Sequence, residues 1–83
     1  MNLAQLKKGQ KAWISKVQGE EADRVTLRLM ELGMLEGGEV ELVHEAPYGG
    51  DPIAVRVRGG MIALRRAEAA RVQIVLKEER GQS

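Results

Sequence analysis

Few side chains in this sequence can do chemistry, and they are scattered along the chain. There is one histidine, His44, together with two serines and no cysteine. A transition-metal site built from this chain alone would have to join His44 to carboxylates such as Glu45 or Asp51, without the paired-ligand spacing that makes a metal motif specific. The lack of cysteine excludes disulfides, thiolate ligands and thiol nucleophiles.

Catalysis needs a nucleophile and a base that converge, and the sequence offers no such pair. It contains no G-x-S-x-G elbow, no phosphate-binding glycine loop and no Ser/His/Asp set. We therefore expect no enzyme activity, no cofactor and no metal site. Strand alternation predicts that the ring of His44 is partly buried beside Leu42 and Ile53, which favours a structural role for it. A weak direct metal sensor based on His44 and carboxylates is the alternative.

The charge balance argues against a nucleic-acid partner. Thirteen Lys and Arg face twelve Asp and Glu, which leaves a formal net charge of +1, far from the basic excess of a protein that binds a phosphate backbone. The first ten residues lack the apolar region of a signal peptide, and no run approaches the roughly 18 apolar residues of a membrane span. We expect a cytoplasmic protein that meets a membrane only through a partner.

Alternating apolar and polar residues predict about five short strands that close into a small barrel. One modest core is all that a chain of 83 residues can build, so we expect a single domain over residues 1–77 and a disordered tail over 78–83. The residues 65–70 favour one helical turn. The expected strands lie near residues 10–18, 39–46, 53–58, 61–65 and 71–77.

A helix is expected after the first strand, because apolar residues recur at helical spacing between residues 19 and 34. Gly33 stands where a left-handed C-terminal cap would place it, and Met34 would then fold back on Leu29. Acidic residues near the start complement the helix dipole. They are Glu20, Glu21 and Asp23.

The second and third strands form a hairpin whose register is limited by side-chain parity. Opposed residue numbers must sum to an odd value, because otherwise one strand would turn its apolar residues to water. A sum of 97 pairs Glu41 with Arg56 and Glu39 with Arg58 on the outer face. On the inner face it pairs Leu42 with Val55. A sum of 99 also keeps the faces correct, so both registers remain open.

Two turns carry apolar or aromatic residues where solvent exposure would predict polar ones. One is the elbow that follows the helix cap, and the other is the hairpin tip with its single tyrosine. Such residues in exposed turns are typical of contacts with another protein. The candidate partner-binding residues are Met34, Leu35, Pro47, Tyr48, Gly49 and Asp51.

The order of these turns and strands resembles the FeoA family, ferrous iron transport protein A, over residues 28–74. No single element is specific, but their order and spacing together are. The matching elements are Leu32-Gly33-Met34, Gly37, Ala46-Pro47, Asp51-Pro52, Gly59, Leu64-Arg65 and Glu68-Ala69.

The resemblance implies an SH3-like β-barrel with a helix inserted after the first strand. It also implies a small cytosolic accessory protein that binds the ferrous iron transporter FeoB and modulates its assembly or its nucleotide hydrolysis. The alternative is an SH3-like regulatory module that binds a metal-dependent repressor or another protein.

Overall fold

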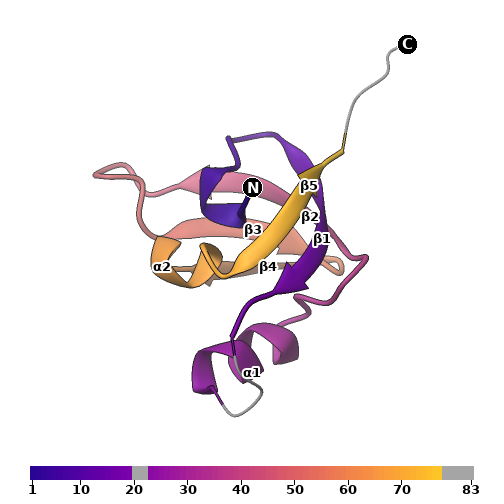
Figure 1. Cartoon of the computed structure of the whole chain (residues 1–83). Coiled ribbons are helices and arrows are strands. Elements are labelled where there is room, and N and C mark those ends of the chain that lie inside the picture. Colours follow the sequence, from indigo (N-terminus) through magenta and orange to yellow (C-terminus); the bar gives the residue numbers. More distant parts are fainter. Residues whose placement is uncertain (20–22, 78–83) are drawn as a thin grey trace.

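Strands in which apolar and polar residues alternate form one antiparallel sheet (Figure 1). This sheet curls around an aliphatic core. The structure is a computed structural model that describes residues 1–19 and 23–77. The expected acidic residues Glu20 and Glu21 and the expected disordered tail lie outside these residues. In chain order the elements are the 3-10 helix η1 (Leu3–Gln5), β1 (Lys11–Val17), α1 (Arg24–Glu31), β2 (Glu39–Glu45), β3 (Ile53–Val57), β4 (Gly60–Leu64), α2 (Arg66–Ala69) and β5 (Val72–Leu76).

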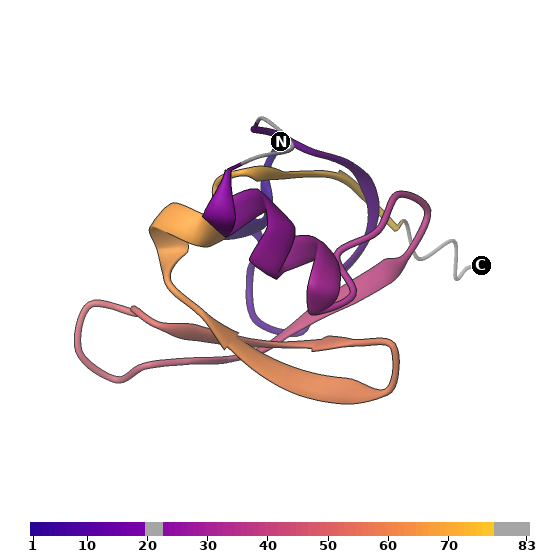
Figure 2. The ribbon, with the colours of Figure 1, turned by 90° about the horizontal axis from the view of Figure 1, so that it is seen from below.

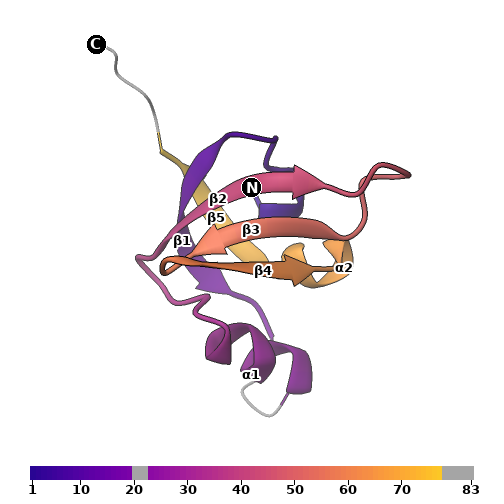
Figure 3. The ribbon, with the colours of Figure 1, turned by 180° about the vertical axis from the view of Figure 1, so that it is seen from behind.

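The strands pair in the order β4-β3-β2-β1-β5, and every neighbouring pair is antiparallel. The sheet bends strongly, so that β5 lies behind the β2 and β3 layer (Figure 3). Five short strands with a helix between the first and the second were predicted, and the structure confirms this barrel. The longest described helix, α1, has 8 residues, and none of the described helices has the length and apolarity to cross a bilayer.

The core is made almost entirely of aliphatic side chains that point inward from the strands. Leu42 and Val55 face each other across β2 and β3 and are fully buried, and Val57 and Ile74 are 3% exposed. Burial of a Val, Leu or Ile side chain stabilises a fold by about 1.5 to 3 kcal/mol. Alternation along the strands thus turns these four apolar side chains into the core.

The first residues of the chain close one end of the barrel, which the sequence analysis missed. Leu3 and Leu6 are buried in the core. Asn2 begins η1 with a reciprocal cap, because its side chain accepts a hydrogen bond from the Ala4 N–H at 2.9 Å while Gln5 Oε1 accepts one from the Asn2 N–H at 2.8 Å. The spacing of Asn2 and Gln5 was the available signal.

The hairpin of β2 and β3 adopts the register with a sum of 97 in its first half. Glu41 opposes Arg56, and their side chains form an ion pair at 3.1 Å, as predicted. The second predicted pair is wrong, because Glu39 binds Lys77 at 2.9 Å instead of Arg58. Arg58 has left the strand and stands in the β3–β4 turn.

A β-bulge interrupts β2 after Leu42 and changes which face the following residues occupy. The pairing shifts from Leu42 with Val55 to His44 with Ala54, so one extra residue, Val43, sits on β2. His44 is consequently exposed on the outer face. The expectation of a partly buried His44 beside Leu42 was wrong, because parity was assumed to continue without interruption.

The helix α1 ends in the cap that the sequence predicted. The N–H of Gly33 donates to the carbonyl of Met30 and the N–H of Met34 donates to the carbonyl of Leu29, both at 3.0 Å. This is the hydrogen-bond pattern of a Schellman motif, and Gly33 has the positive φ of 102° that the motif requires. The side chains of Met34 and Leu29 are both fully buried in the core.

Two ion pairs hold α1 against the segment that joins β4 to β5 (Figure 2). Asp23 caps the helix by accepting a hydrogen bond from the Val25 N–H at 2.8 Å, and its other oxygen binds Arg71 at 2.5 Å. Arg28 binds Glu68 of α2. The helix is therefore attached at its start and along its length.

Substitution of Gly33 should destabilise the fold through two separable effects. A Cβ at residue 33 would strain the left-handed backbone and would lie 2.7 Å from Cδ of Arg58. We expect Gly33→Ala to lower the free energy of unfolding by about 1 to 3 kcal/mol in urea titrations. Gly37→Ala is the control, since Gly37 has a φ of 88° with nothing near its missing Cβ. Equal losses in the two variants would show that the contact with Arg58 contributes nothing.

Acid should weaken the attachment of α1. The hydrogen bond from Arg71, followed by that from the Val25 N–H, holds the pKa of Asp23 below its ordinary value of 3.8. A lowered folded-state pKa means that the stabilisation is present above that ordinary value and is lost as the pH falls through the folded-state pKa. Asp23→Asn keeps the cap but loses the charge. We expect urea titrations at about pH 7 and about pH 3 to show a smaller acid-induced loss for Asp23→Asn than for the wild type. Equal losses would contradict this assignment.

Candidate interaction surface

The turn between β2 and β3, residues 46–52, is fixed at its base by one side chain, that of Arg66. Arg66 is the first residue of α2. Its Nε donates a hydrogen bond to the Gly50 carbonyl at 2.7 Å, and its Nη2 donates one to Glu45 Oε1 at 2.8 Å. Its Nη1 donates to the carbonyl of Ala4 at 2.6 Å. The backbone N–H of Arg66 donates to Asp51 Oδ1 at 3.1 Å. Arg66 thus joins the turn, the end of β2 and the N-terminal segment.

The β-bulge on β2 is what allows Glu45 to reach Arg66. Uninterrupted alternation would place Glu45 on the outer face with Glu41. The extra residue Val43 reverses the parity, so Glu45 opposes Ile53, a core residue, and its carboxylate lies on the side of α2. The bulge therefore exposes His44 and forms the Glu45–Arg66 ion pair in one step.

The hairpin tip, which is the turn of residues 46–52, is also closed by hydrogen bonds between its own backbone groups. The Ala46 N–H donates to the Pro52 carbonyl at 3.0 Å, and the Gly50 N–H donates to the Ala46 carbonyl at 3.1 Å. Gly49 and Gly50 have positive φ values of 76° and 68°. At the top, Tyr48 is 92% exposed, and the tip projects beyond the end of the barrel (Figure 3). The phenol is held outward by an anchored turn.

The predicted candidate residues fall into two groups that the fold does not bring together. Pro47, Tyr48, Gly49 and Asp51 are all exposed on the hairpin tip. The elbow after α1, residues 32–38, lies on the opposite side of the barrel from the tip (Figures 1 and 2).

Within the elbow, the two candidates have different environments. Leu35 is 41% exposed, whereas Met34 is fully buried. The expectation that Met34 is available on the surface is corrected by its contact with the core, which the Schellman cap imposes. Met34 therefore supports the barrel in this conformation.

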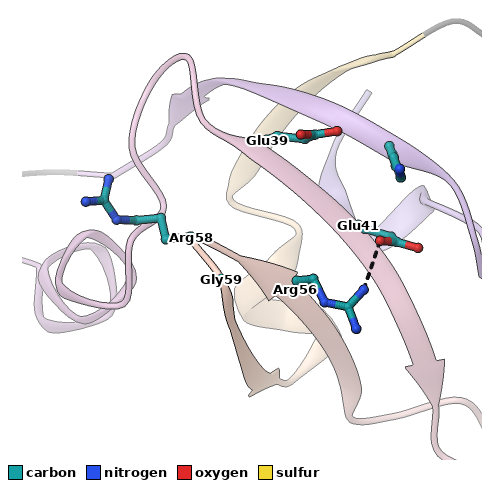
Figure 4. A pocket seen from close by; sticks show the side chains of 6 residues that line it. Glu39, Glu41, Arg56, Arg58 and Gly59 are labelled. Atoms are coloured by element: carbon teal, nitrogen blue, oxygen red, sulfur yellow. Dashed lines mark hydrogen bonds and ion pairs between the residues drawn. The ribbon is translucent and has the colours of Figure 1, made fainter.

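A shallow groove of about 370 Å³ lies on the outer face of β1, β2 and β3 (Figure 4). Its walls are charged or backbone, and Glu41 and Arg56 neutralise each other within it. Arg58 points away from the glutamates, toward the end of the barrel where α1 lies. A groove whose lining includes no aliphatic or aromatic residue is unlike the mostly hydrophobic sites that enclose small molecules. The lining residues are Lys11, Glu39, Glu41, Arg56, Arg58 and Gly59.

The fold separates His44 from the carboxylates that were weighed with it for a metal site. His44 and Glu45 are consecutive on β2 and point to opposite faces, and Glu45 and Asp51 are both bound by Arg66. Over residues 1–19 and 23–77, no three His, Asp or Glu side chains gather in a way that could hold a metal ion.

Comparison with known proteins identifies the family. A family model described as the FeoA domain matches residues 1–76. The chain belongs to the FeoA family.

Two FeoA proteins are similar to this chain over most of its length. A fusion of Fe(2+) transport protein A with the Fe(2+) transporter FeoB, from Porphyromonas gingivalis, is 33% identical over 76 residues, which are 92% of this chain and 9% of the fusion protein. The chain thus spans under a tenth of the curated relative that it matches. The crystal structure of Stenotrophomonas maltophilia FeoA complexed with zinc, an SH3 domain protein, is 38% identical with a TM-score of 0.81, and the match covers 90% of this chain and 89% of that one.

The same barrel also occurs in a manganese-dependent transcriptional repressor, with a TM-score of 0.77 at 13% identity over 93% of this chain and 41% of that one. T. acidophilum IdeR has a TM-score of 0.77 at 19% identity, and the match covers 93% of this chain and 34% of that one. At this identity the likeness shows a shared fold alone. The SH3-like barrel implied by the sequence is thus confirmed for this FeoA chain.

The anchoring role of Arg66 was missed by the sequence analysis, and it can be tested in this FeoA chain by mutation. Arg66→Met leaves the carbonyls of Ala4 and Gly50 without their donors, and we expect a loss of about 2 kcal/mol or more in unfolding free energy. Hydrogen exchange of the Gly50 amide should accelerate, because the tip loses its base.

The matched control is Arg56→Met, which removes the same type of side chain from an exposed pair with Glu41. Its expected cost is below about 1 kcal/mol. If both variants lose the same stability and the Gly50 amide is unaffected, Arg66 does not anchor the tip.

Proposed function

We propose that this protein is a cytoplasmic accessory of ferrous iron transport that binds FeoB. The observation that carries the proposal is the P. gingivalis fusion, in which a segment 33% identical to this chain shares one polypeptide with FeoB. Joining two domains in one chain raises their effective concentration, which benefits function only if the two domains meet. The proposed contact with FeoB is made by the surface of the FeoA domain itself.

The hairpin tip is the part of the surface best suited to this contact. A tyrosine offers a large contact area with few rotatable bonds, and tyrosines are enriched among residues that dominate interface energies. Because Arg66 and the backbone bonds of Ala46 already order the turn, binding would cost little additional conformational entropy. Tyr48, Pro47, Gly49 and Asp51 form this proposed contact.

The proposed action on FeoB is exerted by contact and not by catalysis. Binding at the cytosolic side of FeoB would modulate assembly of the transporter or its nucleotide hydrolysis. Binding to a metal-dependent repressor is the second candidate, and only the shared fold with a manganese-dependent transcriptional repressor supports it.

Tyr48→Ala should weaken binding to the cytosolic domain of FeoB without affecting the fold, because the side chain is 92% exposed. We expect at least about a tenfold rise in Kd by isothermal titration, the effect of losing a contact of about 1.4 kcal/mol. Tyr48→Phe should retain most of the affinity, since it keeps the ring.

The control is Leu27→Ala, which removes an exposed apolar side chain of α1 that is not among the candidate contact residues. It should leave the Kd unchanged. Undiminished binding by Tyr48→Ala would reject the tip as the contact, and absence of binding by the wild type would reject FeoB as the partner.

A further inference from the structure

The strand β4 forms an open edge of the sheet. It pairs with β3 alone, at the end of the strand order. Natural proteins often protect an edge strand from pairing with another strand by placing charged residues or proline on it. The residues of β4, Gly-Met-Ile-Ala-Leu, include neither. At the other edge, β5 is partly covered, because Asn2 forms a bridge with Gln73.

The register of the β3–β4 hairpin shows which backbone groups face outward. Val57 and Gly60 close the hairpin across the two-residue turn Arg58-Gly59, so they form a hydrogen-bonded pair. Bonded and non-bonded pairs alternate along an antiparallel ladder. The N–H and C=O groups of Met61 and Ala63 therefore point away from β3. Among the described residues, no hydrogen bond from another element reaches these groups.

The residues whose backbone groups face outward on β4 are exposed. The side chain of Met61 is 51% exposed, and Ala63 is exposed as well. Figure 3 shows α1 below β4, on the side away from β3, and in Figure 2 the ribbons of α1 and β4 do not overlap. An extended segment could therefore approach β4 from the outside.

Two arginines flank the uncharged run. Arg58 precedes it and Arg65 follows it; both are exposed, and neither forms an ion pair with any residue that the structure describes. Arg58 also holds a φ of 53°, in the left-handed region where this turn type favours asparagine or glycine. A cation kept in a strained backbone position is a feature of functional sites.

These charges decide between possible occupants of the edge. A second copy of this chain paired antiparallel through β4 would bring Arg58 of each copy close to Arg65 of the other, at both ends of the shared ladder. Like charges in such positions are destabilising. An extended segment with acidic residues at its ends would instead complement both arginines.

We propose that β4 binds an extended, acidic-ended segment of another protein, which adds a sixth strand to the sheet. The backbone groups of Met61 and Ala63 supply the hydrogen bonds, and Arg58 and Arg65 select for carboxylates. The inference does not depend on the contact between the hairpin tip and FeoB, because a different surface carries it.

The test uses three synthetic peptides of about nine residues, long enough to span the strand. The first peptide has a Val-Thr repeat flanked by two glutamates at each end, and the second has lysines in place of the glutamates. The third has the sequence of the first, with N-methyl groups on the backbone amides of one edge. Binding to the 15N-labelled full chain is followed by NMR up to about 1 mM. We expect the glutamate peptide to shift the amides of Met61 and Ala63 and to slow their hydrogen exchange, with the other two at least about fivefold weaker.

Two variants complete the test. Ala63→Pro removes an outward donor that β3 does not use, so binding should be lost, while Ala63→Val should bind as the wild type does. If Ala63→Pro does not fold, the N-methylated peptide on the wild type answers the same question. Equal binding of the glutamate and lysine peptides, shifts confined to other residues, or dimerisation through β4 in place of peptide binding would each overturn the proposal. Loss of FeoB binding in Tyr48→Ala would not bear on it.

Discussion

One extra residue on β2 controls the arrangement of this molecule's exposed end. The strand begins with strict alternation, in which Val40 and Leu42 point into the core, and without the bulge His44 would follow them inward. The bulge at Val43 reverses the faces, which places the imidazole in water and the Glu45 carboxylate beside Arg66. The Glu45 carboxylate accepts a charge-assisted hydrogen bond from Arg66 there, a stronger type than a neutral one, which stabilises the end of β2.

That ion pair connects parts of the chain that are distant in sequence. Arg66 also binds the carbonyls of Gly50 and Ala4, so one guanidinium ties together the hairpin tip, α2 and the N-terminal segment. The hydrogen bonds of Arg66 therefore fix the hairpin tip to the packed aliphatic barrel. Tyr48 is thereby presented on a fixed base, while β4 remains uncovered on another side of the same barrel.

The sequence was sufficient for features set by local pattern. Alternation identified the strands and the inward residues such as Val55, and the Leu-Gly-Met elbow identified the cap at Gly33. The bulge could not be predicted, because Val43 and His44 carry neither glycine nor proline to mark it. The role of Arg66 was hidden for the same reason, since its partner Glu45 was assigned to the outer face. Met34 shows a conflict within the expectations: a residue folded back on Leu29 could not also be a surface contact.

The most direct test of this account is a double-mutant cycle for binding to the cytosolic domain of FeoB, measured where all variants are folded. We expect Arg66→Met to weaken binding strongly when Tyr48 is present and much less in the Tyr48→Ala background, because Arg66 positions the ring together with the rest of the tip. Non-additive effects of this kind are expected when two residues work as one unit. Fully additive losses would contradict the central claim that the anchored tip is the interaction surface.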